Sequence, residues 1–216
     1  MAYAPLNLGN LNSPATAAIS MATEEHLRQA HYALTVVMPP EKPEHPGTTL
    51  GTASAVMILL TIAAASAIRH FDPSKNEKIK SDRDAFVECV EAYFPWEHVS
   101  AEDDQYRTGV DLRHAAAKEL YSMLRNPLIH SGGVVGKRYK VPRIMHIYPG
   151  LSPEENENRI IRLCDLVTLS GSTVIKMTAA HSTLYTDALY WCTRKMIERF
   201  AIDPLVQSDI TRNLGI

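Results

Sequence analysis

The sequence predicts a mainly α-helical protein, a bundle of five to six helices with a short β-hairpin or extended arm. Apolar residues recur at helical spacing over most of the chain, and capping residues or prolines stand where these runs begin and end. Only residues 137–148 alternate as strands do. The chain has 216 residues, 45% hydrophobic and 21% charged, so we expect one domain over residues 1–216. It would comprise a bundle (14–200), a basic hairpin arm (134–149) and a C-terminal tail (203–216).

Capping residues and prolines mark three helices in the first half of the chain. Ser13-Pro14 predicts the first start, because a hydroxyl can cap a helix and proline fits its first position. Pro39-Pro40 should stop that helix. A second helix is expected from Leu50 to about His70. Ser81-Asp82 opens the third helix, and Pro95 ends it.

The second of these helices raises the question of a membrane span. Leu50 to Ile68 carries no charge over nineteen residues, which fits either a membrane-spanning helix or a buried core helix. Several small and hydroxyl residues dilute its hydrophobicity, and the sequence offers no second span. We therefore expect a core helix and no membrane association.

Two further helices are expected after the arm. Ser152-Pro153 combines a cap with proline and predicts a helix that runs to about Gly171. A long helix should follow from about Thr173 to Phe200, and Asp203-Pro204 should end it. A short amphipathic tail then remains.

Charge and cysteine content exclude several classes of function. The net charge of -2 argues against a protein that coats nucleic acid or an anionic membrane with its whole surface. Cys89, Cys164 and Cys192 form no CxxC pair, and the chain lacks a signal-peptide pattern, so we expect reduced thiols in a cytoplasmic protein. Asp111 and His114 are spaced to share a metal, but a capping Asp and an exposed His explain them better. We expect no metal and no cofactor.

One segment combines residues suited to phosphodiester chemistry, Arg125-Asn126-Pro127-Leu128-Ile129-His130. Histidine exchanges a proton near neutral pH, and arginine binds phosphate oxygens through paired hydrogen bonds. A base beside a phosphate clamp suffices to cut RNA, because the deprotonated 2′-hydroxyl attacks the neighbouring phosphorus. This chemistry needs no metal.

The break expected within this segment matters for its geometry. The helix that begins near Asp111 runs into it, and on a straight helix Arg125 and His130 would point about 140° apart. Pro127 should end or kink the helix between them, so that both side chains can turn toward one place. Asn126 could then orient the phosphate or the imidazole.

Local charge supports a nucleic-acid site here. No Asp or Glu occurs from Leu120 to Pro153, a window whose five Lys and Arg residues give a charge of +5. Tyr139 lies among these cations as a stacking surface for a base. The candidate RNA-binding residues are Lys137, Arg138, Tyr139, Lys140 and Arg143. Alternatively, Arg125 stabilises a helix C-terminus and the arm is a solvated hairpin.

The run from Leu120 to His130 resembles the signature of the HEPN superfamily, in which arginine, a polar residue and, after four to six residues, histidine close a core helix. Arg125, Asn126 and His130 match that pattern position by position. The resemblance implies a HEPN-like helical bundle, a homodimer with both motifs at its interface and a metal-independent endoribonuclease of a toxin–antitoxin or defence system. It implies His130 as general base or acid, Arg125 as phosphate clamp and Asn126 as orienting group, with RNA and an antitoxin protein as partners.

Two functions remain open at this level. The first is an endoribonuclease that cuts single-stranded RNA, and the second is a non-catalytic interaction or dimerisation module of the same fold.

Overall fold

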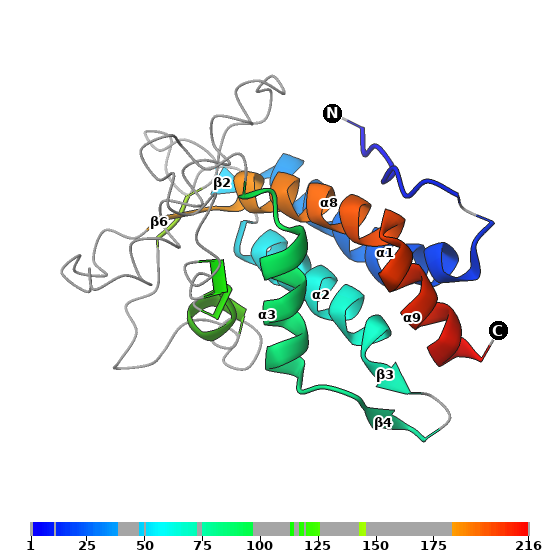
Figure 1. Cartoon of the computed structure of the whole chain (residues 1–216). Coiled ribbons are helices and arrows are strands. Elements are labelled where there is room, and N and C mark those ends of the chain that lie inside the picture. Colours follow the sequence, from blue (N-terminus) through cyan, green and yellow to red (C-terminus); the bar gives the residue numbers. More distant parts are fainter. Residues whose placement is uncertain are drawn as a thin grey trace, which may run out of the picture.

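The structure is a computed structural model, and it describes residues 2–10, 12–38, 48–49, 51–72, 75–96, 113–114, 117–118, 120–125, 143–145 and 183–215. This part of the chain is mainly α-helical, as predicted, and its helices are arranged as a bundle (Figure 1). The described helices are α1 (Pro14–Thr35), α2 (Gly51–Arg69), α3 (Asp82–Tyr93), η3 (Leu120–Arg125), α8 (Thr186–Ile202) and α9 (Pro204–Leu214).

Helix α2 lies at the centre of the bundle. It packs against α1, α3, α8 and α9, and Figure 1 shows it enclosed among them. Its sequence, uncharged before Arg69, supplies five apolar residues with no exposed surface: Ala55, Ile58, Leu59, Ile62 and Ala65. The predicted core helix is therefore confirmed. Within the described ranges, no helix is both long and apolar enough to cross a membrane.

The helix ends follow local chemistry in most places. Ser81 caps α3, because its Oγ accepts a hydrogen bond from the Asp84 amide at 3.1 Å. Ser13 precedes α1 as predicted, but its side chain does not cap the helix. Its Oγ donates instead to Oε1 of Gln207 in α9 at 2.5 Å, so a tertiary contact replaces the expected cap. Helix α1 ends at Thr35, short of Pro39-Pro40.

Three pairs of short strands connect or flank the helices. The sequence did not predict the pair β1–β2 or the pair β3–β4. Strand β1 (Val37–Met38) pairs antiparallel with β2 (Thr48–Thr49), and β3 (Phe71–Asp72) pairs antiparallel with β4 (Glu77–Lys78). Strand β5 (Arg143–Met145) pairs in parallel with β6 (Thr183–Tyr185). Segments of two or three residues are too short to show strand alternation in a sequence.

The pairing of β5 with β6 corrects one predicted helix. We expected a helix from Thr173 to Phe200, but residues 183–185 form strand β6 and α8 begins only at Thr186. Helical spacing continues through this segment in the sequence, whereas its backbone hydrogen bonds go to β5, about 40 residues earlier. The rest of the basic arm, the predicted helix at 152–171 and residues 173–182 lie outside the described residues.

The amphipathic tail is helix α9. The Asp203 side chain caps it by accepting from the Leu205 amide at 2.8 Å, and Pro204 takes the first helical position. Val206 and Ile210 are fully buried, so α9 contributes one face to the core. Gly215 ends the helix with a φ of 71°, a conformation that suits glycine.

Candidate functional site

The candidate motif begins at the last residue of η3. Residues Leu120–Arg125 form a π-helix, not the α-helix expected from their spacing. Pro127, two residues further on, has no amide hydrogen to continue an α-helical ladder, which accords with a loosened last turn. Single π-helical turns inside helical proteins are frequently found at functional sites.

Tyr121 anchors this turn to the core. The side chain is 8% exposed, and its ring meets the Phe86 ring of α3 edge to face with centroids 5.3 Å apart. Such aromatic pairs add stabilisation beyond the area they bury. Leu120 and Ala117 are also buried, so one face of the segment is fixed against the bundle.

Tyr121 also contacts Arg125. The guanidinium carbon of Arg125 lies 5.0 Å from the Tyr121 ring centroid, which is a cation–π distance. Nη1 of Arg125 donates a long hydrogen bond to the Tyr121 hydroxyl at 3.4 Å. The half-buried arginine is thus oriented by a residue that is itself packed on α3. Sequence reasoning did not assign this role to Tyr121, although its position four residues before Arg125 was the available signal.

Of the other predicted site residues, the structure describes only Arg143. Asn126, His130, Lys137, Arg138, Tyr139 and Lys140 lie outside the described residues, as does the predicted convergence of Arg125 and His130. Arg143 is the first residue of β5, and its backbone is in register with Thr183 of β6. The structure therefore places Arg125 by its side chain and Arg143 by its backbone.

His114 has a protein partner. Its Nδ1 lies 2.8 Å from Oε2 of Glu91 in α3, with the histidine side chain 43% exposed. Asp111, the other half of the metal pair considered above, is outside the described residues. Over the ranges that the structure describes, no three His, Cys, Asp or Glu side chains are grouped so as to hold a metal ion.

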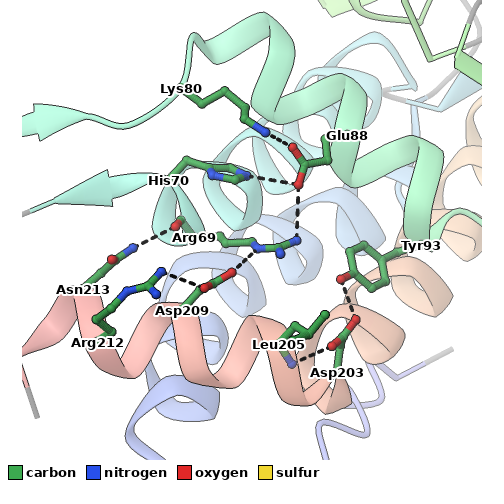
Figure 2. Close-up of polar contacts among 10 residues, drawn as sticks. All are labelled: Arg69, His70, Lys80, Glu88, Tyr93, Asp203, Leu205, Asp209, Arg212 and Asn213. Carbon is green, nitrogen blue, oxygen red and sulfur yellow. Dashed lines mark hydrogen bonds and ion pairs between the residues drawn. The ribbon is translucent and has the colours of Figure 1, made fainter.

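A second polar cluster joins α2, α3 and α9 (Figure 2). Arg69, at the end of α2, donates from Nε to Asp209 of α9 at 2.9 Å, and its Nη1 lies 3.5 Å from Oε1 of Glu88 in α3. Nε2 of His70 is 3.8 Å from the same Glu88 oxygen, and Lys80 forms an ion pair with the other one. We call these five residues the interhelix cluster.

A cavity of about 230 Å³ lies beside the interhelix cluster, between the end of α2, the β3–β4 hairpin and the start of α3. The cavity is lined by Ala67, Ile68, His70, Phe71, Lys78, Lys80, Asp82 and Ala85. Lys78 contacts both carboxylate oxygens of Asp82 at 2.8 Å. Both lysines of the cavity already pair with carboxylates of the protein. We therefore interpret the cavity and the interhelix cluster as part of the packing between helices and not as a ligand site.

The Cys89 thiol is a poor candidate for chemistry. Cys89 and Cys192 are buried, while Cys164 is outside the described residues. Burial raises the pKa of Cys89 to about 12, because the interior disfavours the thiolate. Cys89 is therefore protonated and unreactive at neutral pH.

Comparison with known proteins adds no family to these observations. No protein-family model matches the chain, and no curated protein or solved structure is significantly similar to it.

Proposed function

We propose that this protein is a metal-independent endoribonuclease that cleaves single-stranded RNA, with Arg125, Asn126 and His130 as its site. The observation that carries the proposal is the placement of Arg125. Its guanidinium stands at the end of η3, half-buried and oriented by Tyr121, and Arg125 is followed in the sequence by Asn126, Pro127 and, five residues on, His130. The mainly helical fold is compatible with the HEPN resemblance, which supplies the roles of these residues.

The proposed reaction follows from these side chains. His130 takes the proton of a 2′-hydroxyl, and the resulting oxyanion attacks the adjacent phosphorus. The bond from phosphorus to the 5′-oxygen breaks, and that oxygen takes a proton from an acid, which leaves a 2′,3′-cyclic phosphate and a 5′-hydroxyl. Arg125 stabilises the negative charge that develops on the phosphate oxygens. A homodimer would supply His130 twice, once as base and once as acid.

The contact with Tyr121 suits a phosphate clamp. A long arginine side chain loses rotational freedom when it binds an anion, and this loss weakens binding. A guanidinium that already rests against an aromatic ring in the core has lost part of that freedom before RNA arrives. Arg143 in β5, with the other basic residues of the arm, would bind the RNA backbone.

Cleavage in EDTA tests the proposal. We expect purified wild type to release cyclic-phosphate ends from single-stranded RNA without metal, and we expect His130→Ala to abolish release while its helical circular dichroism persists. His114→Ala is the matched control, because it removes a 43% exposed histidine outside the motif. Absence of cleavage by folded, dimeric wild type across varied RNAs would refute the ribonuclease.

The contacts of Arg125 are equally compatible with the alternative of a non-catalytic interaction module. The contacts of Arg125 with Tyr121 would equally serve an arginine that only stabilises the end of η3. In that case His130→Ala would alter self-association, and wild type would cleave no RNA. A toxin or defence role, an antitoxin partner and a cytoplasmic location belong to the first proposal and depend on it.

A further inference from the structure

Residues 2–8 lie against α1 and α8, and we call them the N-terminal arm, as distinct from the basic arm at 134–149 (Figure 1, dark blue). We call the side chains that contact this arm, together with the two rings beside Arg194, the groove: Glu24 and His31 of α1, and Tyr190, Trp191, Arg194 and Glu198 of α8. The Tyr3 ring meets the His31 ring of α1 at 5.7 Å, and the Asn7 amide bonds to Glu198 of α8. The arm therefore contacts both helices.

Arg194 of α8 recognises the backbone of the arm. Its Nη1 donates to the Ala4 carbonyl at 2.7 Å, and its Nη2 donates to the Pro5 carbonyl at 3.0 Å. The side chain is buried, and the residue is only 7% exposed. Three aromatic rings surround its guanidinium at 5.5 to 5.7 Å, those of Tyr3, Tyr190 and Trp191. Loss of the arm would remove these two carbonyl acceptors and the Tyr3 ring from Arg194.

Two carboxylates of the groove recognise the amide hydrogens of the arm. Glu24 of α1 accepts from the Leu6 amide at 2.9 Å and also from the Tyr3 hydroxyl. Glu198 accepts from the Asn7 amide at 3.0 Å. Donors and acceptors of the groove thus match a peptide backbone. The two carboxylates beside Arg194 disfavour an anion such as phosphate in the same place.

Apolar contacts and a glycine complete the arrangement. Leu6 and Leu8 are 7% and 2% exposed, so both side chains are buried on docking. Gly9 follows with a φ of 74°, a conformation that other residues rarely adopt, and a β-carbon there would lie 3.4 Å from Cγ2 of Ile202. Glycine changes its backbone angles at little cost, so this position can redirect the arm.

We propose that this groove is a peptide-binding site and that its partner is the arm of a second copy of the chain, exchanged reciprocally between two protomers. An exchanged arm makes the same hydrogen bonds and buries the same leucines as a docked one. Only the linker around Gly9 must change direction. Exchange of identical elements is a low-cost route to a dimer, and mass action favours it at high protein concentration. This proposal does not rest on the ribonuclease.

Complementary variants test the exchange. Leu6→Asp disables the arm and leaves the groove intact, while Arg194→Met disables the groove and leaves the arm intact. We expect wild type to dimerise with rising concentration in native mass spectrometry, and each variant alone to dimerise at least about tenfold more weakly. An equimolar mixture, with one variant ¹⁵N-labelled, should form mixed dimers, since one arm and one groove still match. Arg28→Met is the control, because Arg28 is exposed on α1 and should leave dimerisation unchanged.

The outcomes separate this proposal from others. A monomeric wild type at every concentration would overturn it. Dimers that persist equally in both variants would also overturn it, and would indicate another interface such as the one expected at the motif. If Arg194→Met fails to give cooperative unfolding, Glu24→Ala replaces it as the groove variant, because Glu24 is only partly buried.

Discussion

The guanidinium of Arg125 rests on the ring of Tyr121, 5.0 Å from its centroid, and Tyr121 in turn packs edge to face on Phe86. This series of contacts connects the first residue of the candidate motif to helix α3. It gives the arginine a fixed place in the bundle, and its effect can be measured whether or not the protein cleaves RNA.

Changes at Tyr121 should separate the ring from the hydroxyl. Tyr121→Phe loses one long hydrogen bond and should lower the free energy of unfolding by less than about 1 kcal/mol. Tyr121→Leu loses the cation–π and edge-to-face contacts and should cost about 1–3 kcal/mol. Urea unfolding measures both, with Tyr32→Leu as a control at a 52% exposed tyrosine. Equal losses for the Phe and Leu variants would contradict the assigned role of the ring.

Arg125→Lys should test the phosphate clamp. Lysine keeps the charge but cannot grip two phosphate oxygens in a fixed plane. If the ribonuclease proposal holds, we expect kcat/KM for RNA to fall about 100- to 1,000-fold, the range seen when a transition-state donor is lost. The same change at the exposed Arg28 should leave kcat/KM unaltered. An unchanged rate for Arg125→Lys would remove Arg125 from the site.

Two arginines contact Asp209, and they should differ in their effect on stability. The Arg69 side chain is 16% exposed and joins α2 to α9, whereas Arg212 is 71% exposed and lies on α9 itself (Figure 2). Arg69→Met should lower the free energy of unfolding by about 2–4 kcal/mol, because partly buried carboxylates lose their partner. Arg212→Met should cost under about 1 kcal/mol, as exposed pairs do. Similar losses in the two variants would show that burial does not govern this cluster.

His70 should make stability depend on pH. Burial lowers its pKa below 6.5, and the nearby Lys80 and Arg69 lower it further, while Glu88 and Asp209 oppose them. The folded protein therefore holds neutral His70 when the unfolded chain already binds a proton. This stabilisation is present above pH 6.5 and is lost as pH falls through the folded-state pKa. Urea unfolding between pH 8 and 5 should show a smaller loss in His70→Gln than in wild type, and identical slopes would contradict the assignment.

Local chemistry explains which helices were predictable. Ser81 before α3 acts within one turn of the chain, so its effect can be read from neighbouring residues. Asp203-Pro204 was expected to end the preceding helix, and α8 does end at Ile202, but the helix α9 that begins at Pro204 was expected only as an amphipathic tail. The uncharged run of α2 likewise indicated burial, and α2 is the central helix. The strand at Thr183–Tyr185 was missed, because its hydrogen bonds go to Arg143–Met145, far away in the sequence.

The candidate site also has one part that the sequence predicts and one part that depends on tertiary packing. The types and order of Arg125, Asn126 and His130 identify a chemistry, and that information belongs to the sequence alone. The support of Arg125 by Tyr121 and Phe86 arises from packing against α3, which no local pattern specifies.

The sequence by itself therefore determined the helical class, most of the helix ends that the structure describes and the residues of the candidate motif, because propensity and capping act over a few neighbouring residues. Only the tertiary structure decided which distant groups meet. Arg69 pairs with Asp209, 140 residues away in the sequence, and Arg194 donates to the Ala4 carbonyl, 190 residues away. A buried charged group needs hydrogen-bonding partners, and the groups that fold next to it supply them wherever they stand in the sequence.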